Sequence, residues 1–125
     1  MAYTGIYATI EEIQDAAGVN ANAISVSENY INRVIAIVEG EINTLCRKEF
    51  ASSQAAFIAL PAAGKKMLSS TASSLAAIRV IEYDMSGFTS RAEAEDMINV
   101  LRDTALRNLA ILRDDKVQRF IVNGA

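Results

Sequence analysis

Apolar residues recur at steps of three and four along residues 90–113, which is the spacing of one face of an α-helix. Ser90 and Glu93 stand at the start in the order typical of a helix capping box. At about 1.5 Å per residue this helix would be roughly 35 Å long, and it needs tertiary packing to be stable. We therefore predict that the rest of the chain is organised around this helix and covers its apolar face, made of Ala94, Met97, Ile98, Leu101, Ala105, Leu109 and Leu112.

Two further helices are indicated nearer the start of the chain. Thr9 and Glu12 form a capping-box pattern ahead of a short helix that carries Ile10, Ile13 and Ala17 and ends at Gly18. Ser25 and Glu28 repeat the pattern ahead of a long helix that runs to about residue 48. Its apolar positions are Ile31, Val34, Ile35, Val38, Ile42 and Leu45, and Gly40 within it is expected to permit the close approach of a neighbouring backbone.

The middle of the chain is less regular. Residues 49–66 contain Pro61 and Gly64 and keep no period, so we expect a loop with a short extended piece at residues 56–60. A third long helix is predicted from about Ser69 to Tyr83, with Leu75, Ile78, Val80, Ile81 and Met85 as its apolar positions.

The last residues, 117–125, predict a separate arm. They contain the sequence VQRFIV, which favours β structure, and no partner strand is indicated nearby. Such a segment can add to the sheet or groove of another chain, and the alternative is that it folds back over its own core. The sequence thus predicts an all-α domain over residues 1–116, a small bundle of one short and three long helices with an extended middle segment, followed by an extended C-terminal docking arm over residues 117–125.

Composition agrees with a single helical domain. Hydrophobic residues make up 51% of the 125 residues and aromatic residues 6%, so the core must depend on close helix packing more than on large side chains. The net charge of −3 is unevenly spread, because residues 1–46 carry −5, residues 47–79 carry +4 and the remainder carries −2. An acidic end and a basic middle suit a subunit that associates with copies of itself, although charges also fall wherever a surface is solvated.

The residue types give little support for catalysis. The chain has no histidine, which removes the usual general base and the commonest zinc ligand, and it has no phosphate-binding loop. Cys46 is the single cysteine, so no disulfide forms within the chain, and its position predicts a buried hydrophobe rather than a reactive thiol. The acidic pairs Glu11/Asp15, Glu93/Asp96 and Asp114/Asp115 lie where helix starts and solvated faces place them. We predict no enzyme activity, no cofactor and no metal site. No apolar run is long enough to span a membrane and no secretory leader is indicated, so we expect folding inside the cell.

The order of segments resembles the small head–tail connector (adaptor, or head-completion) proteins of tailed bacteriophages. The resemblance is carried by TIEEIQDAAGV, by INTLCRKEF and by SLAAIRVIEYDMSGFTSRAEAEDMINVL. Its best marker is the pattern Val38, Glu39, Ile42 and Asn43 in the second helix, followed by Arg47 and Phe50.

This resemblance implies a structural virion protein, assembled in the host cytoplasm. Its subunits would form a closed homo-oligomeric ring, expected to be a dodecamer, between the portal protein and a downstream stopper or tail protein. DNA would pass through the channel without specific binding, so the channel wall should be neutral or negative. Acids that are candidates for the channel wall are Glu11, Glu12, Asp15, Glu39 and Glu41. The candidate basic patch between subunits is Arg47, Lys48, Lys65 and Lys66, and the candidate docking arm presents Val117, Arg119, Phe120, Ile121 and Val122.

Two other functions stay open at this point. One is a tail-completion or stopper protein of the same machine. The other is a small helical regulator that binds DNA or a partner helix, although none of the predicted helices has the basic exposed face of a DNA-recognition helix.

Overall fold

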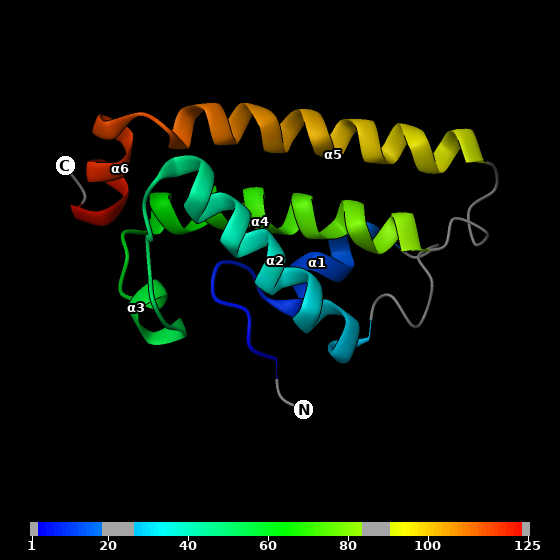
Figure 1. The fold of residues 1–125 in the computed structure, drawn as a ribbon, viewed down its shortest axis with the longest axis horizontal. Helices are drawn as coiled ribbons and strands as arrows, with labels where there is room; N and C mark the ends of the chain where they lie inside the picture. The colour runs from blue at the N-terminus through cyan, green and yellow to red at the C-terminus, as the bar shows by residue number, and fades with distance from the viewer. Residues whose placement is uncertain (1–2, 19–26, 84–90, 124–125) are drawn as a thin grey trace.

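The computed structural model describes residues 3–18, 27–83 and 91–123, and over these residues the chain is all-α (Figure 1). No strand occurs in this described part, which confirms the predicted fold class. Its helices are α1 (Ile10–Ala17), α2 (Glu28–Cys46), α3 (Gln54–Ile58), α4 (Ala62–Tyr83), α5 (Arg91–Leu112) and α6 (Asp115–Asn123).

The central element is α4 rather than the helix at residues 90–113. It contacts α1, α2, α5 and α6, whereas α5 lies along one side of it (Figure 1). Most of its buried positions carry small side chains, among them Ala72, Ser73, Ser74, Ala76 and Ala77. Small side chains allow helices to approach from several directions, and they also weaken the apolar periodicity by which a helix is recognised in sequence.

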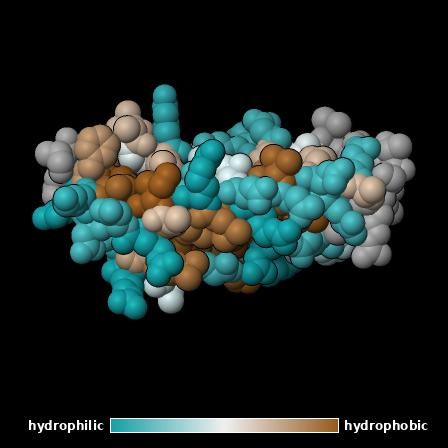
Figure 2. Space-filling model, turned by 90° about the horizontal axis from the view of Figure 1, so that it is seen from above, coloured by the Kyte–Doolittle hydropathy of each residue, from teal (hydrophilic) through white to brown (hydrophobic). Residues whose placement is uncertain are grey.

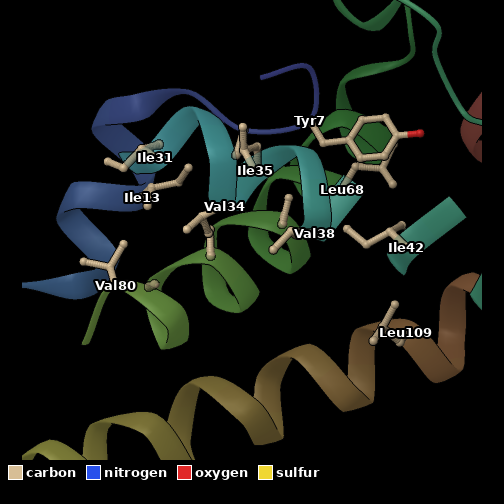
Figure 3. Packing of buried hydrophobic residues seen from close by; sticks show 14 of the residues in the cluster. Tyr7, Ile13, Ile31, Val34, Ile35, Val38, Ile42, Leu68, Val80 and Leu109 are labelled. Carbon is tan, nitrogen blue, oxygen red and sulfur yellow. The ribbon is translucent and has the colours of Figure 1, made fainter. Parts of the chain in front are cut away.

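The core lies where α1, α2, α4 and α5 meet (Figure 3). The predicted apolar stripe of α2 is buried from Ile31 to Ile42. Leu45, the last residue predicted for this stripe, is instead 49% exposed. Cys46, next to it, is buried as predicted. On α5 the predicted face also points inward, because Ala94, Ala105, Leu109 and Leu112 are buried and Met97, Ile98 and Leu101 pack against the same cluster.

Helix starts explain which predicted boundaries were correct. The Thr9 and Glu12 capping box is present, and Gly18 ends α1 with a positive φ of 85°. Ser27 occupies the N-cap position of α2 without a side-chain capping hydrogen bond, and Ser25 lies outside the described residues. Ser90 and Met85 also lie outside them, so the capping box predicted for α5 is not described.

The extended piece predicted at residues 56–60 is wrong. The Ser53 side chain accepts a hydrogen bond from the Ala56 N–H (3.1 Å), which starts the short helix α3. Pro61 then precedes α4 and its carbonyl accepts from the Lys65 N–H (3.0 Å), so α4 begins at Ala62, seven residues before the predicted start. Proline is favoured at the first turn of a helix, where its missing N–H costs nothing.

The extended conformation predicted for the C-terminal arm is also wrong. Residues 115–123 form α6, whose first turn is capped by Asp114, because Asp114 Oδ1 accepts from the N–H of Lys116 (2.8 Å) and Val117 (3.4 Å). Ile121 is buried against α4, and the Gln118 side chain is buried as well. A cap and tertiary contacts therefore override the β preference of Val117, Ile121 and Val122.

Two glycines on neighbouring helices are expected to respond oppositely to alanine. Gly40 is exposed with open space around a Cβ, so it does not serve the close packing predicted for it. A Cβ on Gly64 would lie 2.8 Å from Ile121 Cγ2 and 3.1 Å from the Ile121 backbone. We expect Gly40→Ala to raise the free energy of unfolding by about 0.5–1 kcal/mol, because alanine favours the helix.

Gly64→Ala should lower that free energy by about 1–2 kcal/mol, because the backbone of α6 must shift away from α4. Urea unfolding followed by circular dichroism measures both variants. A Gly64→Ala protein as stable as Gly40→Ala would show that α6 is not held close to α4.

Candidate functional site

The most elaborate polar arrangement is the anchoring of residues 3–8 on one flank of α2. Asn32, Glu39 and Asn43 lie seven and four residues apart, which places them on one side of the helix next to its apolar stripe. Asn32 Oδ1 accepts from the Thr4 N–H (2.9 Å) and Glu39 Oε2 accepts from the N–H groups of Ile6 and Tyr7, the latter at 2.7 Å. A segment without regular structure thereby gains partners for its backbone donors.

Tyr7 connects this segment to three other parts of the chain. Its hydroxyl donates to Asn43 Oδ1 and accepts from the Phe50 N–H (3.1 Å). Its carbonyl accepts from Ser69 Oγ on α4 (2.9 Å), and its ring packs edge-on against Phe50 at 6.3 Å between centroids. Since the ring is buried as well, Tyr7 fixes the segment relative to α2, α4 and the α2–α3 connection.

Burial changes the acidity of the groups in this arrangement. The pKa of the partly buried Glu39 carboxyl is raised, because desolvation outweighs the two N–H groups that bind it. The pKa of the Tyr7 hydroxyl is raised by burial, and that of Tyr3 is raised by burial and by the nearby charge of Glu39. Burial likewise raises the pKa of the Cys46 thiol despite nearby Arg113, which fits the prediction of an inert, buried cysteine.

Two neighbouring hollows open beside this segment. The first has a volume of about 480 Å³. One side is formed by Tyr3 and residues 5–12, and the other by Gln54, Phe57 and Ile58. The second, of about 490 Å³, shares Glu12, Phe57 and Ile58 and continues along α4 past Lys65 and Lys66 to Ser73. Phe57 and Ile58 give both hollows apolar lining next to charged side chains, a combination that surfaces binding a partner also show.

The acids predicted for a channel wall lie in different settings. Glu11 and Glu12 line the hollows, and Asp15 is exposed on α1. Glu39 holds residues 6 and 7, and Glu41 forms an ion pair with Arg79 (2.7 Å).

The predicted basic residues fall into two groups. Lys65 and Lys66 line the second hollow, whereas Lys48 lines another of about 340 Å³ with Asp115, Gln118, Arg119 and Val122 of α6. Arg47 is exposed where α2 ends, in a left-handed conformation. Of the residues predicted for the arm, Phe120 and Arg119 are exposed, while Ile121 is buried and Val117 and Val122 are partly buried.

The anchoring role of Asn32, Glu39 and Asn43 was not predicted, although Glu39 and Asn43 belong to the pattern that carries the resemblance. Polar residues that keep helical spacing beside an apolar stripe are the signal that indicates such a role.

Within the described residues no group of three or more acidic or cysteine side chains is placed to hold a metal ion. The same residues include no helix that is both long and apolar enough to cross a membrane.

No protein-family model matches the sequence, and searches of curated proteins and of solved structures give no match. The resemblance to phage head–tail connectors therefore stays a prediction, and the functional argument depends on the residues and the fold.

Proposed function

We propose that this chain is the subunit of a ring-shaped head–tail connector that sits below the portal of a tailed bacteriophage and extends the DNA channel toward the tail. The observation that supports this proposal is the distribution of large apolar side chains on the surface. Val100 and Leu106 on α5 are 66% and 57% exposed, Ile58 on α3 is 69% exposed, and Ile37 on α2 is 50% exposed.

These side chains lie on helices at different sides of the molecule (Figure 1). Seen from above, hydrophobic residues form a broken band bordered by hydrophilic ones (Figure 2). A two-fold dimer needs one self-complementary surface, whereas a subunit of a closed ring needs two different surfaces that meet in neighbouring copies. Apolar residues on several helices fit the second requirement better.

In such a ring the remaining acids would contribute to the channel wall. Glu11, Glu12 and Asp15 on α1 are the candidates, because Glu39 binds residues 6 and 7 and Glu41 pairs with Arg79. A negative wall would let DNA slide past without binding. Virion localisation, the portal above and the stopper or tail protein below belong to the same proposal.

Electron microscopy and mass photometry of the purified protein, alone and with its portal, test this function. We expect closed rings of identical subunits. Monomers that persist in the presence of the portal would contradict the proposal, and so would tight, salt-sensitive binding of DNA by the isolated protein, which would favour a regulator. Rings that bind only a tail protein would favour the stopper role.

The outer face of α6 is expected to provide part of the docking surface. Phe120 is 46% exposed, so Phe120→Ser removes a side chain that is only partly buried and should lower the free energy of unfolding by about 1–2 kcal/mol, which leaves the chain folded. Binding to the portal or to a neighbouring subunit should weaken by about tenfold if this aromatic side chain is an anchor. Biolayer interferometry against the immobilised portal measures this, with exposed Lys116→Ser as the matched control on the same helix. Unchanged binding would remove α6 from the docking surface.

A further inference from the structure

The most exposed large apolar residue of the described part, Ile58, lies on a basic rim. It is 69% exposed at the end of α3, and its carbonyl accepts a hydrogen bond from Lys65 Nζ (3.1 Å). Lys66 is exposed and lines the same hollow of about 490 Å³, as does Phe57. We call Phe57, Ile58, Lys65 and Lys66 the α3 patch. Glu12 also borders this hollow, but its carboxylate accepts from the Thr9 N–H (2.8 Å) in the capping box.

The second most exposed large apolar residue, Val100, has acidic neighbours instead. It is 66% exposed on α5, and Asp96 and Asp103 stand four residues before and three residues after it. This spacing places both carboxylates beside Val100 on the outer face of the helix, and both residues are exposed. We call Asp96, Val100 and Asp103 the α5 patch.

The two patches match each other in chemistry, because each combines an exposed apolar side chain with charges opposite to those of the other. Within one copy they are separated by α4, since α3 and α5 lie on different sides of it (Figure 1). The match can therefore be used only between copies. Opposite charges around an apolar contact steer association and fix its register.

We infer that the α5 patch of one copy docks on the α3 patch of the next copy. Val100 would enter the hollow beside Phe57 and Ile58, and Asp96 and Asp103 would face Lys65 and Lys66. Because the two surfaces differ, each copy still offers one free patch after pairing, which allows a ring to grow and close. This inference rests on the proposed function in taking a second copy as the partner, and it names the surfaces that the ring would use.

Cysteine cross-linking between copies tests the contact directly. One batch carries Ile58→Cys and another Val100→Cys, both in a Cys46→Ala background whose helical fold is checked by circular dichroism. After mixing and mild oxidation we expect a disulfide-linked dimer with one copy of each variant, while either batch alone stays uncross-linked. Failure of the mixed sample to cross-link, with cross-links in a single batch instead, would overturn this pairing.

Charge reversal tests the same contact without cysteines. Lys66→Glu and Asp103→Lys should each raise the dissociation constant of self-association by about tenfold, measured by sedimentation velocity. The double variant Lys66→Glu/Asp103→Lys should return to within about threefold of the original value, since opposite charges face each other again. Asp15→Lys and Lys116→Glu, which change exposed residues outside both patches, are the matched controls and should leave association unchanged.

The outcomes separate this inference from the proposed function. If the charge-reversed chains form rings normally and the mixed cysteine variants give no cross-link, the pairing is overturned. The proposed ring would then stand with other contact surfaces. Cross-linked open chains that never close, even with the portal, would support the pairing and contradict the connector function. A protein that stays monomeric at every concentration and with the portal would overturn both.

Discussion

Replacing Glu39 by alanine is expected to lower the free energy of unfolding by about 2–3 kcal/mol, because the N–H groups of Ile6 and Tyr7 both lose their acceptor. The loss should extend beyond these two bonds, since the same segment carries Tyr7, whose hydroxyl and carbonyl bind Asn43, Phe50 and Ser69. Chemical denaturation followed by far-ultraviolet circular dichroism measures the change.

Glu41 provides the matched control two residues further along the same helix. It pairs with Arg79 at 2.7 Å, but the side chains are 39% and 44% exposed. An exposed ion pair contributes at most about 1 kcal/mol, so Glu41→Ala should be nearly neutral. Equal losses in both variants would show that α2 does not anchor the N-terminal segment through Glu39.

The raised pKa of Glu39 adds a pH dependence to this prediction. A carboxyl group whose pKa is higher in the folded chain than its ordinary value of 4.5 binds more protons when folded, in the pH range between the two values. Stability from this group is therefore full below about pH 4.5 and falls as the pH rises through the folded pKa. Tyr3 and Tyr7, which share the segment, have raised pKa values and ionise well above this range.

Glu39→Gln removes this titration while keeping one side-chain oxygen as an acceptor. Denaturation midpoints of both proteins from pH 4 to 7 should therefore diverge, with the unmodified protein losing stability relative to the variant as the pH rises. Parallel curves would mean that Glu39 has the same pKa in the folded and unfolded chain.

Helices with a clear apolar stripe could be predicted from sequence, and α1, α2 and α5 are of this kind, with the predicted capping box present at α1. The central helix α4 was predicted seven residues too short, because Pro61, Gly64 and the loss of helical periodicity before Ser69 indicated a loop where the helix already begins at Ala62. Extended structure was predicted at residues 56–60 and 117–125, whereas caps at Ser53 and Asp114 start the helices α3 and α6 in these regions. Both caps are standard N-cap residue types, but their effect depends on contacts that only the folded chain provides.

The candidate site shows the same division. Charge patterning indicated Lys65 and Lys66 as an interface, and the structure adds Phe57 and Ile58 to the same hollow. The charge pattern in the sequence could not show that Arg47 and Lys48 lie apart from Lys65 and Lys66, because position near a helix end does not fix the neighbours of a side chain. The anchoring by Glu39 depends on contacts more than thirty residues apart, which periodicity within one helix does not reveal.

Replacing Gln118 by glutamate is expected to cost about 3 kcal/mol or more at neutral pH, because a carboxylate cannot donate the two hydrogen bonds that hold α6. Gln118 is 9% exposed, and its Nε2 donates to the carbonyls of Cys46 (2.8 Å) and Leu112 (2.9 Å), the last residues of α2 and α5. A carboxylate there would face two carbonyl oxygens without a proton to share. The carboxylate must either become protonated or leave the core. If it leaves the core, α6 moves with it and Ile121 is displaced from Gly64.

Gln54 is the matched control for this exchange. Its Nε2 also donates to a backbone carbonyl, that of Gly5, at 2.8 Å, but Gln54 is exposed. Water can solvate a carboxylate at that position, so Gln54→Glu should cost less than about 1 kcal/mol. The loss in Gln118→Glu should shrink as the pH is lowered toward 4, because a protonated carboxyl regains one donor. A loss that is small at neutral pH and independent of pH would show that α6 does not depend on Gln118 for its place beside α2 and α5.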